Sequence, residues 1–292
     1  MKNTLFTISI ALLTICCSCK GDNEAGVDTD GTMNGVFSVS DSTQVKFSRG
    51  NLQYQPSSST WRFAETQYDV IGSDNENISA TYTGWIDLFG WGTSGWNSGA
   101  VSYMAYDTSA AYANYCPGGD TSANLTGNFA NADWGMYNAI ENGGKTPGQW
   151  RTLTKSEWKY LLTNRKGAGD KFGLAKVNNV DGLVILPDSW TQPDGVDFTA
   201  GHDNGFKTNR YSAAKWSKMQ AAGAVFLPAA GYRERVSVFT KFTNYTECGF
   251  YWSSTHISNI NCNILFFGKE TVNPTNFAKR HFGLAVRLVK DI

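Results

Sequence analysis

The sequence predicts a mixed α+β fold with short antiparallel strands, two or three helices and long irregular loops. Short apolar segments alternate with polar residues between turn-forming residues, which is typical of strands. Few segments show the three-to-four-residue spacing of apolar side chains that a helix requires. The chain also contains 30 glycines, 10 tryptophans, 13 tyrosines and 17 phenylalanines. That composition is typical of a loop-rich domain packed around aromatic rings.

The N-terminus has the order of a secretory signal. Lys2 precedes an apolar run at 5–15, and the cysteines Cys16, Cys17 and Cys19 follow. A charged start, a short apolar run and small residues define such a signal, and this run is too short to span a bilayer. The cysteines resemble a bacterial lipobox, with Cys19 as the lipid acceptor. We therefore expect a lipoprotein signal peptide over 1–19, with an ordinary secreted protein as the alternative.

Residues 20–34 are polar and lack apolar periodicity, so we expect a flexible tether. Its start, residues 20–24, resembles the acidic segment of Bacteroidetes lipoproteins that are sent to the cell surface. The resemblance implies an outer-membrane protein, held by its lipid anchor and facing the cell exterior. No linker or charge run divides the remainder, which predicts one domain over 35–292.

Charge and cysteine content exclude some classes of function. Lysine and arginine together number 25, as do aspartate and glutamate. This balance gives no electrostatic reason to expect a nucleic-acid partner. Beyond the signal the three histidines are scattered and no Cys-x-x-Cys pair occurs, so no metal site or cofactor is predicted. Beyond the signal, three cysteines remain, which allow either one disulfide with a spare thiol or three free thiols. They are Cys116, Cys248 and Cys262.

The first half of the domain is predicted to contain hairpins and a long loop. Alternating segments at 35–39, 44–48, 51–54 and 60–63 predict a meander of short strands. The stretch 84–128 is dominated by glycine, serine, asparagine and aromatic residues. Loops of this length inside a domain usually carry function.

Helices and buried strands follow. Thr154 and Glu157 form a capping box, which predicts a helix starting at residue 155. Residues 212–222 predict a second helix, ended by Gly223, and 132–141 a third. Three apolar runs predict buried strands. The first two end in Leu-Pro, and we expect the strand to end there because proline has no N–H group to donate to the ladder. These runs are 182–187, 223–228 and 284–289.

Five motifs together carry a resemblance to a known family. They are WRTLTKSEW (150–158), VILPDSW (184–190), VFLPAAGYR (225–233), FYWSST (250–255) and GLAVRLV (283–289). In this order they resemble the Fibrobacter succinogenes major paralogous domain family. That family is similar to the formylglycine-generating-enzyme branch of the C-type lectin fold. The resemblance implies a C-type lectin-like domain over about 35–292.

The C-terminal third also resembles the variable proteins of diversity-generating retroelements. Their binding residues lie between a Tyr-Trp-Ser-Ser element and a final Gly-x-x-Val-Arg-Leu-Val strand, here 250–289. Mutation of template adenines converts an Asn codon to a limited set of residues. Seven residues between 256 and 263 fit that set, whereas Lys269, Glu270 and Lys279 do not.

The resemblance implies a surface that binds an external protein or glycan. Aromatic, asparagine and serine side chains suit such a surface, because they give contact area and adaptable hydrogen bonds at low entropic cost. The predicted ligand-binding residues are His256, Ser258, Asn259, Asn261, Asn263, Phe267, Thr275, Asn276, Phe277, His281 and Phe282.

Other interpretations stay open at this point. A formylglycine-generating-type oxidase would use Cys248 and Cys262 as a metal-binding pair. A structural component of the envelope or of a fimbrial tip would need no defined ligand. Arg233 and Arg287 lie beside core strands, so we expect them to be buried and paired and not to bind ligand. The tripeptide 192–194 matches a calcium-lectin motif but is equally a common turn.

Overall fold

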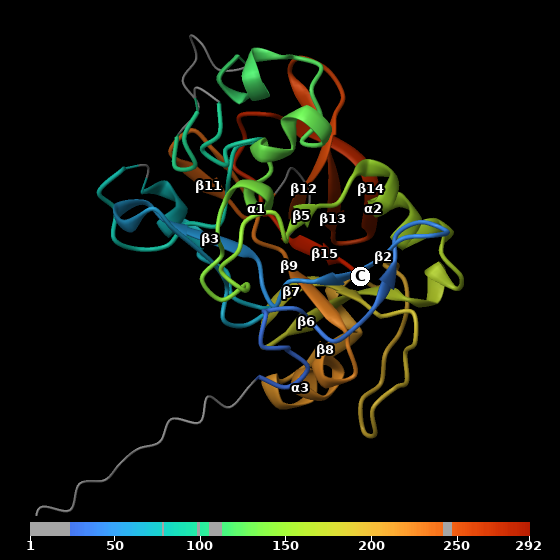
Figure 1. Cartoon of the computed structure of the whole chain (residues 1–292). Helices are drawn as coiled ribbons and strands as arrows, with labels where there is room; N and C mark the ends of the chain where they lie inside the picture. Colours follow the sequence, from blue (N-terminus) through green and yellow to red (C-terminus); the bar gives the residue numbers. More distant parts are fainter. Residues whose placement is uncertain (1–23, 78, 98–99, 105–112, 242–246) are drawn as a thin grey trace, which may run out of the picture.

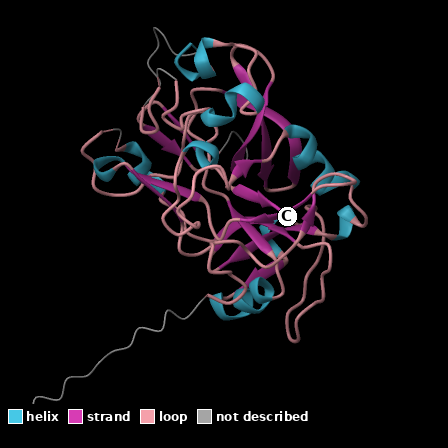
Figure 2. Cartoon of the chain, in the orientation of Figure 1, coloured by secondary structure: helices cyan, strands magenta, loops and turns pink. Residues whose placement is uncertain are grey.

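The computed structural model describes residues 24–77, 79–97, 100–104, 113–241 and 247–292 (Figure 1). Over these ranges the chain is a mixed α+β structure with several short, mainly antiparallel sheets and few helices (Figure 2). The predicted fold class is thus confirmed at this level. The predicted signal peptide and Cys19 lie outside the described residues. Within the described ranges no helix is both long and apolar enough to cross a bilayer.

Strands from the first and the last part of the described chain form a four-stranded sheet of order β1-β2-β15-β5. Its strands are β1 (Phe37–Ser38), β2 (Gln44–Phe47), β15 (Leu288–Asp291) and β5 (Arg151–Thr152). Because β15 occupies the second edge of β2, the predicted meander is interrupted there. The next two strands, β3 (Leu52–Gln55) and β4 (Thr60–Phe63), form a separate hairpin.

The predicted Leu-Pro strands are neighbours in a second four-stranded sheet, of order β8-β6-β7-β9. In it β7 pairs antiparallel with β9, whereas β6 and β8 run parallel. The pairing sets Gly182 opposite Pro228 at the end of the ladder, as expected for a residue without an N–H group. The strands are β6 (Phe172–Val177), β7 (Val180–Ile185), β8 (Asn209–Tyr211) and β9 (Val225–Pro228).

Local sequence signals set the helix ends. The capping box is present: Thr154 accepts a hydrogen bond from the Glu157 N–H, and Glu157 accepts one from the Thr154 N–H. It begins α2 (Lys155–Lys159), which continues as a π-helical turn, Tyr160–Asn164. Ser212 caps α3 (Ala213–Ala221). The third predicted helix shortens to α1 (Trp134–Tyr137).

Short 3-10 helices connect these elements. The described ones are Pro56–Ser58, Gly72–Glu76, Ala113–Tyr115, Pro117–Gly119, Gly127–Ala132, Ala168–Asp170 and Gly205–Lys207.

The C-terminal region forms a three-stranded antiparallel sheet of order β12-β13-β14. It comprises β12 (Gly249–His256), β13 (Asn261–Gly268) and β14 (Thr271–Lys279). A small hairpin, β10 (Tyr232–Glu234) and β11 (Ser237–Phe239), precedes it. The predicted strand 284–289 is divided, since Leu284 and Ala285 make single bridges and β15 begins only at Leu288.

Two hydrophobic clusters cover opposite faces of the C-terminal sheet. Leu265 and Phe267 of β13 belong to the cluster that contains Trp158 of α2. The alternating residues Ile264 and Phe266 belong to the second cluster, with Trp252. Because side chains alternate along a strand, both faces of β13 are therefore apolar. This burial fixes the backbone from which the polar turns extend.

The flexible tether predicted over 20–34 is wrong for residues 24–34, which pack on the domain. Met33 is fully buried, and it forms an isolated antiparallel β-bridge with Val27. Glu24 accepts a hydrogen bond from Arg49 at 2.9 Å and one from Gln220 at 2.9 Å. The segment is too short to show apolar periodicity, yet one buried methionine and several ionic contacts hold it in place.

Candidate ligand-binding site

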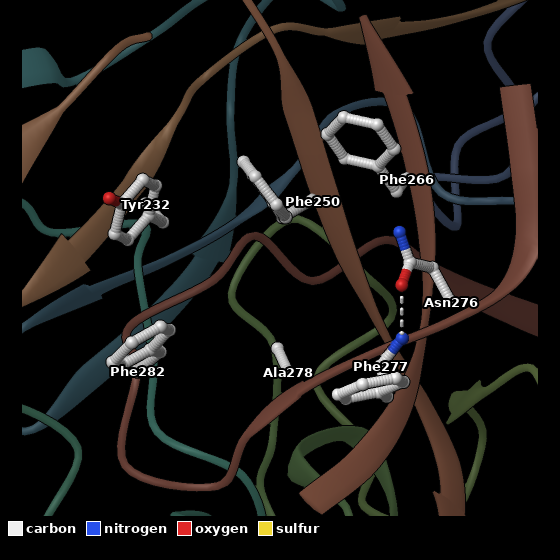
Figure 3. A pocket seen from close by; sticks show the side chains of 7 residues that line it. All are labelled: Tyr232, Phe250, Phe266, Asn276, Phe277, Ala278 and Phe282. Carbon is white, nitrogen blue, oxygen red and sulfur yellow. Dashed lines mark hydrogen bonds between the residues drawn. The ribbon is translucent and has the colours of Figure 1, made fainter. Parts of the chain in front are cut away.

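An aromatic hollow opens beside the C-terminal sheet, with a volume of about 310 Å³ (Figure 3). Strands β12, β13 and β14 supply most of its walls, and β10 and the segment after β14 complete it. Its volume lies at the lower end of the range for small-molecule pockets, about 300–1,000 Å³. This hollow is called the aromatic pocket. It is lined by Tyr232, Phe250, Phe266, Asn276, Phe277, Ala278 and Phe282.

Ring packing defines the shape of the aromatic pocket. The Tyr232 ring stacks on Phe282 with centroids 5.5 Å apart, and on Phe239 at 5.2 Å. Phe250 meets Tyr232 edge-on at 5.3 Å. Phe277, at 60% exposure, is the most exposed aromatic ring of the lining. Mutual packing restricts ring motion, so the walls present a rigid apolar surface.

The described lining contains no charged side chain. The lining has one side-chain amide, that of Asn276, whose Oδ1 accepts a hydrogen bond from the Phe277 N–H at 2.8 Å (Figure 3). The Lys279 ammonium lies 5.8 Å from the centroid of the Phe282 ring. That ammonium disfavours a cationic ligand group in the pocket. The walls therefore favour a neutral apolar group, such as a hydrocarbon side chain or the C–H face of a sugar.

The turn joining β12 to β13, residues 257–260, is exposed and is called the hairpin tip. Ile257 is 44% exposed, and Asn259 is also exposed. At its base, His256 Nδ1 lies 2.8 Å from the Asn124 side-chain oxygen, which also accepts the His256 backbone N–H. A loop distant in sequence thus braces the tip, which follows a register shift between Trp252 and His256 in the β12–β13 pair.

Buried Arg280 connects the hairpin tip to the same loop region. Its guanidinium donates to the carbonyls of Thr121 at 2.6 Å and Ser258 at 2.8 Å. The group also lies 4.7 Å from the centroid of the Trp91 ring. Five donors in a rigid fork let one arginine satisfy several carbonyls at once. Arg280 therefore fixes the tip from below without contacting solvent.

The eleven predicted binding residues divide by exposure. Asn259 and Phe277 are exposed. Six are partly exposed and can contact a ligand: His256, Ser258, Asn261, Thr275, Asn276 and Phe282. Three, however, are buried, and their assignment to the binding surface is corrected: Asn263, Phe267 and His281.

Each buried residue has a structural role. Asn263 donates to the Asn276 carbonyl at 2.8 Å across the strand pair. Phe267 stacks on Tyr251 at 6.0 Å in the core. His281 lies edge-on to Phe282 at 5.0 Å. Burial, together with nearby Lys279, lowers the pKa of His281 to about 4, so its imidazole is neutral at pH 7.

The cysteine pair of the oxidase interpretation is not formed. All three described cysteines are buried. Gly249, next to Cys248, pairs with Phe267, whereas Cys262 pairs with His256. Phe267 and Cys262 lie five positions apart along β13, which corresponds to about 17 Å. Burial also raises the pKa of the Cys262 thiol, which disfavours the thiolate that binds metals.

Four lining residues were missed as binding residues: Tyr232, Phe250, Phe266 and Ala278. Tyr232 and Phe250 lie in quoted motifs, where their apolar character indicated strand packing. They line the pocket only because β10 lies beside the C-terminal sheet. The pattern of apolar residues within each strand does not predict that two separate strands lie side by side. The other polar and aromatic residues of the lining, Asn276, Phe277 and Phe282, were among the predicted binding residues.

Comparisons with protein-family models, with curated proteins and with solved structures gave no match.

Proposed function

We propose that the protein binds an external protein or glycan through a surface formed by the aromatic pocket and the hairpin tip. The aromatic pocket carries this proposal, because rigid rings around a hollow and an exposed Phe277 provide a place for an apolar ligand group. The partly exposed polar residues of β14, Thr275 and Asn276, lie along the same strand. They would supply hydrogen bonds beside the apolar contact.

The proposal includes a C-type lectin-like fold and a lipid anchor at Cys19 in the outer membrane. The short sheets, few helices and long loops are compatible with that fold. The retroelement resemblance adds the possibility of sequence variation at exposed positions of 250–289. The hairpin tip supports this idea, since Ile257 and Asn259 can change without disturbing buried contacts.

Phe277→Ser tests the proposal. The full chain carrying Cys19→Ala, which cannot be lipidated there, is screened against a printed glycan array and a displayed peptide library. We expect Phe277→Ser to weaken binding to the strongest hit by at least about tenfold, since buried aromatic anchors contribute 2 kcal/mol or more to an interface. Circular dichroism should stay unchanged, because the ring is exposed.

Tyr137→Ser is the matched control. Tyr137 is 43% exposed and belongs to α1, outside the pocket lining. It should leave binding unchanged. Equal binding by the wild type and Phe277→Ser, or equal loss in both variants, would place the ligand elsewhere.

A further inference from the structure

A second hollow, distinct from the aromatic pocket, lies at the edge strand β8 and has a volume of about 270 Å³. In Figure 1, β6 and β8 lie in the lower part of the molecule, below β12–β14. The lining combines two cations, two amides and two hydroxyl residues, with no carboxylate among them. These residues are Lys176, Asn178, Asn179, Arg210, Tyr211 and Ser212.

The two cations are direct neighbours in the sheet. Lys176 of β6 and Arg210 of β8 are partners in the parallel ladder. Like charges placed directly opposite one another destabilise a strand pair. Lys176 is compensated on its other side by an ion pair with Asp181. Arg210 is exposed and forms no ion pair with any residue that the structure describes.

An adjoining hollow of about 250 Å³ shares Lys176 and Arg210 and adds further charges. Lys207 and Lys269 contribute two more cations, and Asp181 and Glu247 contribute two carboxylates. Lys269 is paired with Glu270 at 3.6 Å, so four basic side chains meet three acidic ones, which leaves an excess of one positive charge. The first turn of α3, which follows Ser212, holds no acidic residue either. Glu247 forms no described ion pair, but it lines this adjoining hollow and not the first one.

The backbone around the first hollow is fixed. Asn178 and Asn179 form the turn between β6 and β7 with φ angles of 46° and 68°. The Asn178 N–H donates to the Tyr211 carbonyl at 2.9 Å, which ties this turn to β8. The amides, the Ser212 hydroxyl and the two cations are consequently held around one space. Such donor sets bind oxyanions by charge-assisted hydrogen bonds.

We propose that this hollow binds a phosphate-class oxyanion, with the Arg210 guanidinium as the principal ligand and Lys176 as the second cation. A planar guanidinium can bind two phosphate oxygens at once. The anion would also relieve the repulsion between the two neighbouring cations. Free phosphate and the phosphate of a lipid headgroup share this chemistry. The proposal is independent of the aromatic pocket.

Titration of the full chain carrying Cys19→Ala with inorganic phosphate, at constant ionic strength in sodium chloride, tests the site. We expect saturable amide shifts in the nuclear magnetic resonance spectrum at 176–179 and 210–212. Arg210→Ser should weaken the apparent affinity about tenfold or more, because hydrogen bonds to charged groups contribute about 1.5–3 kcal/mol. Lys166→Ser, which removes an exposed cation outside this lining, is the matched control.

Vesicles identify the source of the phosphate. Sedimentation with phosphatidylglycerol vesicles but not with phosphatidylcholine vesicles, lost in Arg210→Ser, would support a lipid headgroup. A phosphate response without sedimentation would support a free anion. Absence of saturable shifts in these two segments, or an equal loss in Arg210→Ser and Lys166→Ser, would overturn the proposal.

Discussion

Buried arginines connect distant loops through backbone carbonyls and amide oxygens. Arg287 is 1% exposed and donates to the Gln67 side-chain oxygen at 2.8 Å. Arg233 is 2% exposed and donates to the Met104 carbonyl at 3.2 Å. Burial lowers the pKa of each to about 10, so both stay charged at pH 7. The prediction that Arg233 and Arg287 are buried is confirmed, and their described hydrogen-bond acceptors are neutral oxygens.

Trp252 and the hairpin tip should differ sharply in their effect on stability. Trp252 is fully buried and donates from its indole to the Phe89 carbonyl at 2.7 Å. We expect Trp252→Ala to lower the free energy of unfolding by about 3–5 kcal/mol. Asn259→Ser should stay within about 0.5 kcal/mol, because Asn259 is exposed. Urea denaturation measures both free energies of unfolding. Similar losses would show that Trp252 does not belong to the core or that Asn259 does not belong to the surface.

His281 should make stability depend on pH. Its pKa is lowered from 6.5 to about 4 in the folded protein, so the unfolded chain binds its proton more readily. The free energy of unfolding should therefore fall between about pH 6.5 and pH 4, by up to about 3 kcal/mol. Burial raises the pKa of Asp87 and Asp133 to about 6. These groups act in the opposite direction, because they bind protons more readily when folded.

The comparison with His281→Leu isolates the histidine. Asp87 and Asp133 are present in both proteins, so their contributions cancel in the difference between the two free energies of unfolding. We expect the wild type to lose more stability than His281→Leu on acidification from pH 7 to pH 4. A difference that stays constant over this range would mean that folding does not lower the pKa of His281.

At the scale of elements, local signals predicted the start of α2 and the two strands that end in Leu-Pro, whereas the helix predicted at 132–141 and the strand predicted at 284–289 are shorter or divided. The capping box at Thr154 and the Leu-Pro ends at 187 and 228 depend on the chemistry of neighbouring residues, so sequence is sufficient for them. The binding strands were harder to divide into core and surface. Alternation separates the two faces only when one face meets water, and β13 is buried on both. This is why Asn263 and Phe267 were assigned to the surface.

Arg280 should control the order of the hairpin tip. Arg280→Met removes donors to Thr121 and Ser258 and leaves their carbonyls without this partner. A fully buried acceptor without a partner costs about 1–3 kcal/mol, and these two carbonyls are partly buried. We expect faster amide hydrogen exchange at 257–261 and 116–125, with little change in the β6–β7 pair. Unchanged exchange at the tip would show that Asn124 and the strand ladder alone fix it.

At the scale of the whole molecule, the described chain begins at the end opposite to the hairpin tip. Glu24 contacts Gln220 of α3, and Figure 1 places α3 at the bottom while β12 and β13 extend upward. Five residues from Cys19 to Glu24 span at most about 18 Å. A lipid on Cys19 would hold the α3 end near the membrane. The hairpin tip would then lie at the end of the molecule away from it.

Cys19→Ala tests this arrangement. A single acyl chain gives only marginal membrane binding, whereas two or three chains anchor a protein stably. We therefore expect Cys19→Ala to move the protein from the membrane fraction to the soluble fraction and to abolish incorporation of labelled palmitate. Cys17→Ala is the matched control, because it changes a neighbouring cysteine and should leave both readouts intact. Membrane association and labelling that persist in Cys19→Ala would remove the anchor, and with it the proposed orientation of the binding surface.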